Sequence, residues 1–163
     1  MTPEELAKHL NETGLFERDE VAHGELSMWA SRDGWVAGAE HLKECGRCRF
    51  DFFTFISAVD LEDEGFEVVC HLYSVRRQHH INYKTLLPRT EPRLRTLKGL
   101  WLGADWGERE THELFGIDFD GHGDLRRLLL PDEFEGFPLR KDFLLMSREI
   151  KEWPGLKEPE EVK

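Results

Sequence analysis

The alternation of apolar and polar residues predicts a series of short helices and strands. The first segment, residues 2–14, reads TPEELAKHLNETG. Thr2 can serve as an N-cap, with Pro3 at the first helical position and Glu5 three residues after the cap. Because Gly14 can end such a segment, the pattern predicts a short N-terminal helix.

The next segments mix strand and helix signals. Residues 25–38, ELSMWASRDGWVAG, alternate apolar and polar positions around Asp33-Gly34, a dipeptide that tolerates the positive φ values of a tight turn. This pattern predicts two strands joined by a hairpin. Residues 39–48, AEHLKECGRC, are expected to be helical, whereas residues 50–60, FDFFTFISAVD, fit either a buried strand or a helix with one apolar face.

A second hairpin is predicted from residues 66–88. FEVVCHLYSV is rich in β-branched and aromatic residues, and HINYKTLLP follows it after the polar turn at residues 76–78. Beyond residue 130 the chain carries prolines at positions 131, 138, 154 and 159 among scattered charges, which indicates a mostly extended segment. The sequence therefore predicts an α+β fold, an antiparallel or mixed sheet with helices packed on it, in residues 1–130, followed by an extended C-terminal docking arm and tail in residues 131–163.

Composition narrows the classes of partner. The chain has 163 residues, enough for one domain of ordinary size, and a formal net charge of -11 from 33 acidic and 22 basic residues. This balance argues against nucleic acid or an anionic lipid surface as the main partner. Since no signal-peptide pattern and no long apolar run is found, we expect a cytosolic chain that reaches a membrane only through a partner.

The three cysteines give the sharpest metal candidate. Cys45 and Cys48 are three apart, and Cys70-His71 could complete a zinc tetrahedron. Neighbours in a strand point to opposite faces, however, so Cys70 and His71 are not expected to reach one ion. The sequence therefore favours free thiols, and three cysteines are too few for the four thiolates of an iron-sulfur cluster.

The other sequence patterns that could indicate a catalytic site do not match known catalytic motifs. His112-Glu113 lacks a second histidine four residues after the first, because that position is Gly116. His122 and Asp124 lie in a glycine-rich turn, where a histidine is more often a hydrogen-bonding fixture than a catalyst. A free-standing metal hydrolase would need its ligands from these residues and is kept as a remote alternative. We find no glycine-rich phosphate loop, dinucleotide fingerprint or serine nucleophile motif.

Charge is concentrated in residues 105–131, DWGERETHELFGIDFDGHGDLRRLLLP. Asp105 can cap a helix that Gly116 ends, which predicts a helix over residues 106–115 with a polar centre. Trp106, Leu114 and Phe115 are its expected apolar anchors. The charge pattern alone does not distinguish a solvated surface helix from an interaction surface. It likewise does not distinguish a solvated loop from a partner-facing patch in the basic region of residues 76–98.

The charged stretch resembles the signature of one protein family, the 30-kDa (NuoC-type) subunit of respiratory complex I, NADH-quinone oxidoreductase. The resemblance covers about residues 50 to 145. Gly123 stands where the family usually has proline, and Phe137 where histidine is common. The segments that carry the resemblance are Trp106, ERE at 108–110, ELFGIDFDGH at 113–122, DLRRLLLPD at 124–132, GFPLRKDF at 136–143 and the strand FEVVCHLYSV.

The resemblance implies a scaffold subunit of the peripheral arm, on the cytoplasmic side of the bacterial cell membrane, with no cofactor of its own. FMN and iron-sulfur clusters would sit in partner subunits, and a 49-kDa-type quinone-site subunit and a 20-kDa-type iron-sulfur subunit would be its neighbours. Relatives in membrane-bound hydrogenases or dehydrogenases with another electron donor remain open, as does an isolated binding module. The residues expected at the subunit interface are Trp106, Glu108, Arg109, Glu110, Phe115, His122, Asp124, Arg126, Arg127, Arg140, Lys141, Asp142 and Phe143.

Overall fold

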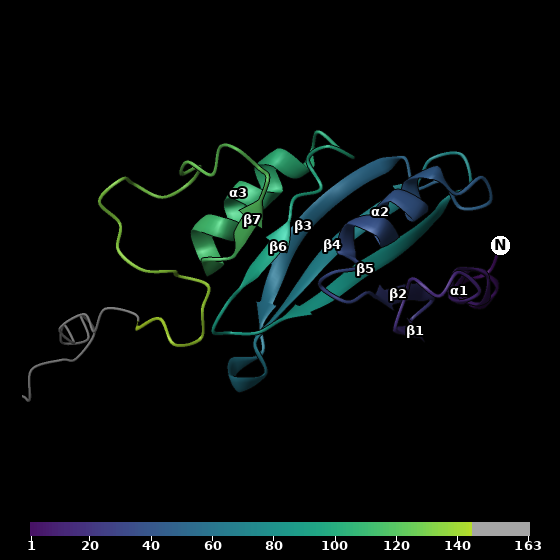
Figure 1. The fold of residues 1–163 in the computed structure, drawn as a ribbon, viewed down its shortest axis with the longest axis horizontal. Helices are drawn as coiled ribbons and strands as arrows, with labels where there is room; N and C mark the ends of the chain where they lie inside the picture. Colours follow the sequence, from purple (N-terminus) through teal and green to yellow (C-terminus); the bar gives the residue numbers. More distant parts are fainter. Residues whose placement is uncertain (145–163) are drawn as a thin grey trace, which may run out of the picture.

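The computed structural model describes residues 1–144, in which helices alternate with strands (Figure 1). The elements in chain order are α1 (Pro3–Asn11), β1 (Arg18–Ala22), β2 (Glu25–Trp29), α2 (Trp35–Glu44), β3 (Phe52–Asp60), a 3₁₀ turn (Glu62–Glu64), β4 (Phe66–Ser74), β5 (His79–Leu87), β6 (Arg93–Arg95), α3 (Ala104–Phe115) and β7 (Asp118–Asp120).

The main sheet is mixed. Its five strands run in the order β1-β2-β5-β4-β3, and only the β2-β5 pair is parallel. A parallel pair needs a long crossover, which α2, β3 and β4 supply here. Two short parallel strands, β6 and β7, form a second sheet beside α3.

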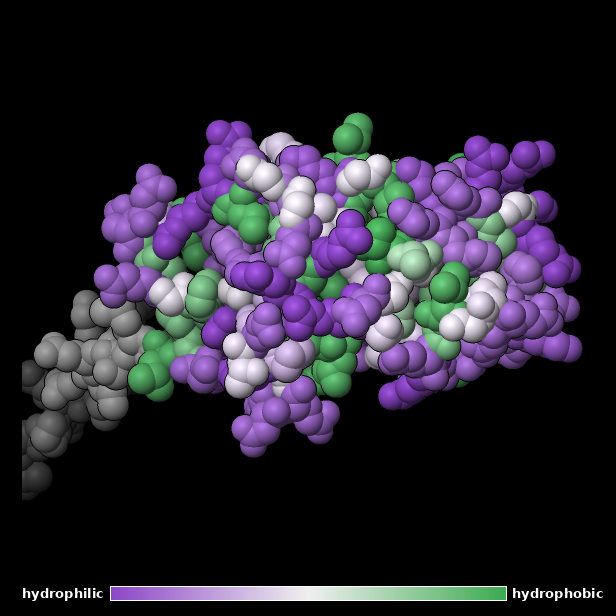
Figure 2. Space-filling view, viewed as in Figure 1, coloured by the Kyte–Doolittle hydropathy of each residue, from purple (hydrophilic) through white to green (hydrophobic). Residues whose placement is uncertain are grey.

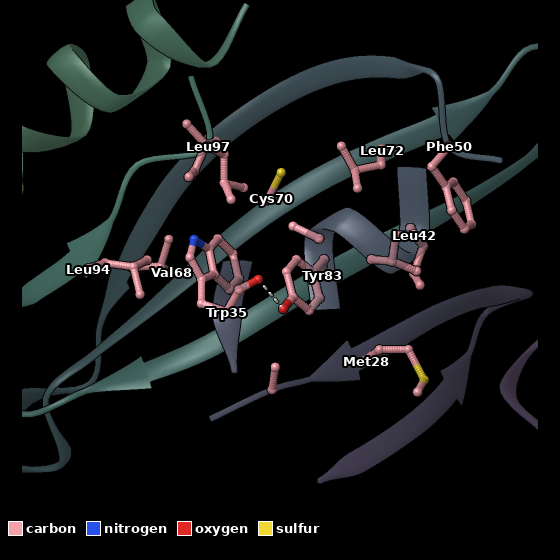
Figure 3. Packing of buried hydrophobic residues seen from close by; sticks show 14 of the residues in the cluster. Met28, Trp35, Leu42, Phe50, Val68, Cys70, Leu72, Tyr83, Leu94 and Leu97 are labelled. Atoms are coloured by element: carbon pink, nitrogen blue, oxygen red, sulfur yellow. Dashed lines mark hydrogen bonds between the residues drawn. The ribbon is translucent and has the colours of Figure 1, made fainter. Parts of the chain in front are cut away.

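One face of the main sheet holds the core. Residues of β4 alternate between buried and partly exposed along the whole strand, as expected where only one face is covered. On the covered face Tyr83 stacks on Trp35 of α2 at a ring distance of 4.3 Å and donates a hydrogen bond to its carbonyl oxygen (Figure 3). Leu42 of α2 and Leu72 of β4 lie in the same fully buried cluster.

Helix α3 rests against β3 on the same face. Gly107 makes this approach possible, because a Cβ atom there would lie 2.7 Å from a methyl carbon of Ile56. At the other end of α3 the ring of Phe115 packs edge-on against Phe66 of β4. All three helices therefore contact the covered side or edge of the sheet, and within residues 1–144 no helix packs on the face that carries Phe55, His71 and His80.

The α+β architecture and the mixed sheet are confirmed. The segment left open between helix and strand is β3, and the hairpin predicted over residues 66–88 is β4-β5. The hairpin predicted at Asp33-Gly34 is wrong, because α2 begins at the next residue. Gly34 has φ -81°, outside the range a type I′ turn requires.

The predicted arm begins as an irregular segment. Residues 131–144 contain turns but no helix or strand, and they contact the domain: the Leu139 N–H donates to the Leu114 carbonyl at 3.1 Å. The rest of the predicted arm, residues 145–163, lies outside the described residues. Within residues 1–144, no helix has the length and apolar character needed to cross a bilayer.

Apolar side chains reach the surface at several separate places. Figure 2 shows them as green areas set among hydrophilic residues. Around the charged stretch, Leu102, Trp106 and Leu129 are 85%, 63% and 61% exposed. Large apolar groups this exposed are candidates for burial against another protein.

Candidate functional site

Helix α3 organises the charged stretch. It runs from Ala104 to Phe115, so Asp105 lies in its first turn and Gly103 takes the N-cap position predicted for Asp105. The C-terminal prediction is confirmed: Gly116 has φ 72° and donates its N–H to the His112 carbonyl at 2.8 Å. Two of the charged side chains of α3 project toward the loop that follows β7.

Glu113 binds this loop through its carboxylate. The backbone N–H groups of Leu128, Leu129 and Leu130 donate to the two carboxylate oxygens at 3.0, 2.9 and 2.5 Å. Burial acts to raise the pKa of Glu113, but these three donors outweigh it and bring the pKa below its usual value. Glu113 thus replaces secondary structure as the hydrogen-bonding partner for three successive backbone groups.

Arg109 binds the same loop one helical turn earlier. Its guanidinium donates to the carbonyl oxygens of Arg126 and Arg127 at 3.1 and 3.0 Å, and the residue is only 8% exposed. The loop of residues 126–130 is therefore held by one acceptor and one donor that project from the same helix. We call these two side chains the loop clamp.

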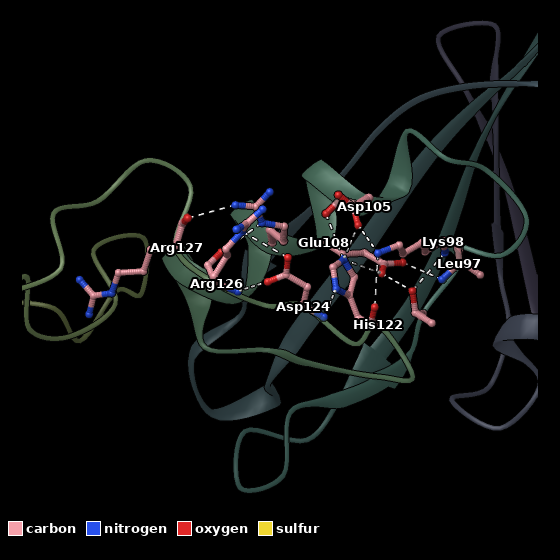
Figure 4. A network of polar contacts seen from close by, with 10 residues as sticks. Leu97, Lys98, Asp105, Glu108, His122, Asp124, Arg126 and Arg127 are labelled. Carbon is pink, nitrogen blue, oxygen red and sulfur yellow. Dashed lines mark hydrogen bonds and ion pairs between the residues drawn. The ribbon is translucent and has the colours of Figure 1, made fainter.

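A third buried charge, Glu108, holds the segment before α3 (Figure 4). Its carboxylate accepts hydrogen bonds from the Thr96 hydroxyl and from the Leu97 N–H, the latter at 2.6 Å, and its side chain is fully buried. Burial raises the pKa of Glu108 to about 7, although both hydrogen bonds and Lys98 act to lower it. The ion pair between Lys98 and Asp105, at 2.5 Å, closes the network on the solvent side.

His122 belongs to this network as a fixture. Its side chain is completely buried, with Nε2 3.1 Å from the Asp105 carbonyl oxygen, and Nδ1 accepts from the Asp124 N–H at 3.3 Å. The glycine turn continues at Gly123, whose φ of 81° is a value that the ring of proline does not allow. His122 therefore fixes the turn that leads into the loop clamp.

The residues considered for a metal hydrolase do not converge. His112 Nδ1 lies 3.0 Å from the Ile117 carbonyl oxygen, while Glu113 is engaged by the loop and His122 by Asp105. Within residues 1–144 these groups do not form a cluster whose ligand atoms all lie within 4.8 Å of one another. The geometry gives this alternative no support.

The predicted interface residues beyond α3 also have contacts inside the chain. Arg140 donates to the carbonyl oxygens of Phe115 and Gly116, and the ring of Phe143 stacks on Phe134 at 5.9 Å. Arg127 donates to the carbonyl oxygens of Pro131 and Phe134. These contacts hold the loop and the first part of the arm against α3.

Asp60 at the end of β3 is the main anchor of the arm. It accepts from Arg89 at 2.6 Å and from the Lys141 N–H at 2.8 Å, while Asp142 pairs with the same arginine at 2.8 Å. Burial acts to raise the pKa of Asp60, but these donors, with the Glu62 N–H, outweigh it and lower the pKa.

The predicted interface set therefore divides by exposure. Four members are buried and have contacts within the chain: Glu108, Arg109, Phe115 and His122. The expectation that Trp106 is an apolar anchor of the helix is wrong, because its side chain is 63% exposed, and the same expectation for Phe115 is confirmed. The members that remain exposed around the loop clamp are Trp106, Glu110, Asp124, Arg126 and Arg127.

The basic region is largely neutralised by this chain's own acids. Arg89 pairs with Asp60, Lys84 with Glu67 at 3.1 Å, and Lys98 with Asp105. Arg76 and Arg77 at the β4-β5 turn instead line a surface hollow together with Lys43, Glu44, Gly46, Arg49 and Asp51.

The cysteines lie apart from the charged stretch. Cys70 is fully buried on the covered face of β4, and His71 lies on the open face, where it stacks on Phe55 at 5.5 Å. The predicted opposition of Cys70 and His71 is therefore confirmed. The group that sequence spacing missed is His9, because it comes from α1, 36 residues before Cys45, and its Nε2 lies 3.4 Å from the Cys45 sulfur.

Comparison with known proteins gives a consistent result. Residues 28–149 match the family described as "Respiratory-chain NADH dehydrogenase, 30 Kd subunit". The C subunit of NADH-quinone oxidoreductase from Sinorhizobium medicae is 38% identical over 145 residues, covering 86% of this chain and 72% of that protein. The corresponding protein of Jannaschia sp. is 41% identical and covers 85% and 69%. That of Chloroherpeton thalassium is 39% identical, covering 68% of this chain, which spans about half, 47%, of its length.

Two solved structures share the fold. A trypsin-resistant fragment of Nqo5, residues 1–134, superposes with a TM-score of 0.66 at 29% identity and covers 76% of this chain and 99% of the fragment. A chain from the membrane-bound sulfane sulfur reductase, an archaeal respiratory membrane complex, gives a TM-score of 0.79 at 26% identity and covers 98% of both chains.

Proposed function

The chain belongs to the family of the 30-kDa subunit of respiratory-chain NADH dehydrogenase, and on that premise we propose that it is a scaffold subunit in the peripheral arm of a proton-translocating NADH-quinone oxidoreductase. In this role the chain carries no cofactor. FMN and iron-sulfur clusters in partner subunits pass electrons from NADH to quinone, and this chain keeps those subunits in register.

The observation that carries the proposal is the match of residues 28–149 to the family, with relatives named as the C subunit of NADH-quinone oxidoreductase that cover most of the chain. The use of the charged residues supports a scaffold. Glu108, Arg109 and Glu113 are buried and hydrogen-bonded to backbone groups, so they determine the shape of a surface and are not free to react with a substrate.

The contact surface proposed for this role lies over the loop clamp. Trp106, Arg126 and Leu129 are exposed there on a rigid base, and large aromatic and arginine side chains are the residues that most often dominate binding energy. Glu110 and Asp124 add carboxylates that can pair with a partner's cations. Charge sets the register of such a contact, and the burial of apolar groups supplies affinity.

The partners proposed for this surface and for the arm are the 49-kDa-type quinone-site subunit and the 20-kDa-type iron-sulfur subunit. Through them the chain is attached to the membrane on its cytoplasmic side. Arg140 donates to carbonyl oxygens at the end of α3. Lys141 binds Asp60 and Glu62, and Asp142 pairs with Arg89. They act in the assembly by presenting the arm in a fixed position.

A second candidate is the equivalent subunit of a related membrane complex with another electron donor. The structural match to the sulfane sulfur reductase chain, over 98% of both chains, favours it. The higher identity to the C subunits of several bacterial NADH-quinone oxidoreductases, 38% to 41%, favours the first candidate.

The experiment that separates the two is removal of this gene from its source cells. Under the first proposal, membranes lose NADH-to-quinone electron transfer and a plasmid copy of the gene restores it. Under the second, NADH-to-quinone transfer is unchanged and electron transfer from a different donor is lost. Retention of every membrane electron-transfer activity would contradict both.

A further inference from the structure

We propose that His9, Cys45 and Cys48 form a binding site for a zinc-like divalent metal ion. The inference is independent of the assembly role proposed above, because α1 and α2, at whose ends the three residues lie, are placed toward the other end of the main sheet from α3, which carries the loop clamp (Figure 1). Their potential ligand atoms, the imidazole nitrogen and two sulfurs, all lie within 4.8 Å of one another.

The distances fit a tetrahedral ion. With Zn–S of about 2.3 Å and Zn–N of about 2.0 Å, two ligand atoms on a tetrahedron are separated by about 3.5–3.8 Å. The Nε2 atom of His9 lies 3.4 Å from the sulfur of Cys45, so an ion can be placed between them with little movement. Two thiolates and an imidazole are ligands that zinc favours, and two cysteines three residues apart are a common half of such a site.

The ligands are held by backbone that is already ordered. Cys45 caps the C-terminus of α2, and its carbonyl accepts from the N–H groups of Cys48 and Arg49 at 3.2 and 2.8 Å. The Phe50 N–H returns to the Leu42 carbonyl at 2.9 Å. This tight turn brings the sulfurs of Cys45 and Cys48 within 4.8 Å of each other, so binding an ion requires little ordering of the chain.

The third ligand comes from a separate element that is fixed independently. Helix α1 begins with a capping box between Thr2 and Glu5, and its Leu6 and Leu10 are buried in the core. His9 therefore projects toward Cys45 from a docked helix. A metal ion here would join α1 to the end of α2, two elements that are distant in sequence.

A fourth position and an outer partner are also available. His9 lies in a surface hollow together with Glu5 and Glu12, so water or a carboxylate can complete the tetrahedron from the solvent side. The other ring nitrogen of His9 is 4.0 Å from a Glu12 carboxylate oxygen, so a small rotation of the Glu12 side chain would let this carboxylate accept the Nδ1 proton, as carboxylates do for many metal-binding histidines. Arg47, now 3.4 Å from that nitrogen, would turn away when Nδ1 carries the proton.

The competing interpretation is a pair of thiols that form a disulfide. It explains the spacing of Cys45 and Cys48 but leaves the position of His9 without a purpose. A hydrogen bond between His9 and one thiol is the other interpretation, and it does not require the second cysteine. A metal site requires all three groups as direct ligands at the spacing observed, which is the reason for the proposal.

The test uses the purified full chain, reduced, treated with a chelator and then titrated with Co²⁺ and with Zn²⁺. We expect one equivalent of Co²⁺ to give the intense visible spectrum of a tetrahedral site with thiolate-to-metal absorption, and Zn²⁺ to displace it. Cys45→Ser and Cys48→Ser should each weaken binding at least about 100-fold, since loss of an outer partner alone commonly costs about 10–100-fold. His9→Ala should weaken it and change the absorption of the bound cobalt.

Two control variants keep the test specific. His23→Asn changes an exposed histidine in the β1-β2 turn, where asparagine tolerates the φ of 54°, and Cys70→Ala removes the remaining thiol; both should retain the site. Circular dichroism verifies that every variant is folded. Absence of stoichiometric binding, binding that survives both Cys45→Ser and Cys48→Ser, or a metal-free Cys45–Cys48 disulfide in protein alkylated at cell lysis would each overturn the proposal.

Discussion

The carboxylate of Glu113 accepts the backbone N–H of Leu129 at 2.9 Å, and the N–H groups on either side of Leu129 donate to the same carboxylate. One buried side chain therefore satisfies three backbone donors in a loop that has no strand to pair with. Arg109 satisfies two carbonyls of the same loop. The dense charge of residues 105–131 is thus used first to shape the chain, and the exposed side chains displayed on that shape are available to a partner.

We expect Glu113→Gln to lower the free energy of unfolding by about 1–3 kcal/mol, because an amide replaces one acceptor oxygen with a donor that faces a backbone N–H. Glu110→Gln on the exposed side of the same helix is the matched control and should change it by no more than about 0.5 kcal/mol. Urea unfolding of the full chain measures both. Equal stabilities of the two variants would show that the Glu113 carboxylate does not stabilise the loop.

Glu108 gives a pH signature. Its pKa in the folded chain is raised to about 7, against about 4.3 for an unfolded glutamate, so between these values the folded state holds a proton that the unfolded state lacks. The contribution of Glu108 to stability is therefore full below the unfolded pKa and is lost as the pH rises through about 7.

Glu108→Gln removes this ionisation. The free energy of unfolding of the variant relative to the original chain should rise by up to about 3 kcal/mol between about pH 5 and about pH 8, while the effects of the other carboxylates cancel in the difference. Urea unfolding at a series of pH values provides the measurement. Parallel stability profiles would mean that Glu108 titrates as an ordinary exposed glutamate.

Trp106 tests the proposed contact surface. Its side chain is 63% exposed, so Trp106→Ala should leave the free energy of unfolding within about 0.5 kcal/mol while weakening assembly by about 30-fold or more, as loss of a central aromatic residue does. Val75→Ala, at a 57% exposed apolar residue after β4, is the control. Affinity for the purified remainder of the complex would be measured. Unaltered affinity would remove Trp106 from the interface.

Truncation of the arm distinguishes a role in stability from a role in assembly. The sequence predicts that removal of residues 131–163 leaves the fold intact and weakens assembly. Because Lys141 and Asp142 bind Asp60 and Arg89, we expect a chain that ends at residue 130 to fold but to be about 1–3 kcal/mol less stable than one that ends at residue 144. Thermal unfolding compares them. Identical stabilities would show that these contacts do not hold in solution.

Sequence patterns predicted the elements whose signals are local. The alternation in residues 66–75 and the turn at 76–78 gave β4 and β5, and Thr2 with Glu5 gave α1. The Asp33-Gly34 hairpin failed because the same dipeptide can precede a helix, and burial of Trp35 in the core favours α2 there. Strand β1 was not predicted, since RDEVA is an exposed edge strand with no apolar alternation.

The site was harder to predict because its contacts are not local. Charge pattern located the important helix but not the interior position of Glu108 and Arg109, which depends on segments 11 to 18 residues away. Pairing of His9 with Cys45 depends on how α1 docks. Periodicity tells which face a residue occupies, but it does not tell which distant group that face meets.

The most direct test of the scaffold role is purification through a tag on this chain from native membranes in mild detergent, with identification of the co-purifying proteins and an assay of NADH-to-quinone electron transfer. The account predicts a large assembly that contains quinone-site and iron-sulfur subunits together with that activity. Recovery of this chain alone, with neither partner subunits nor activity, would contradict it.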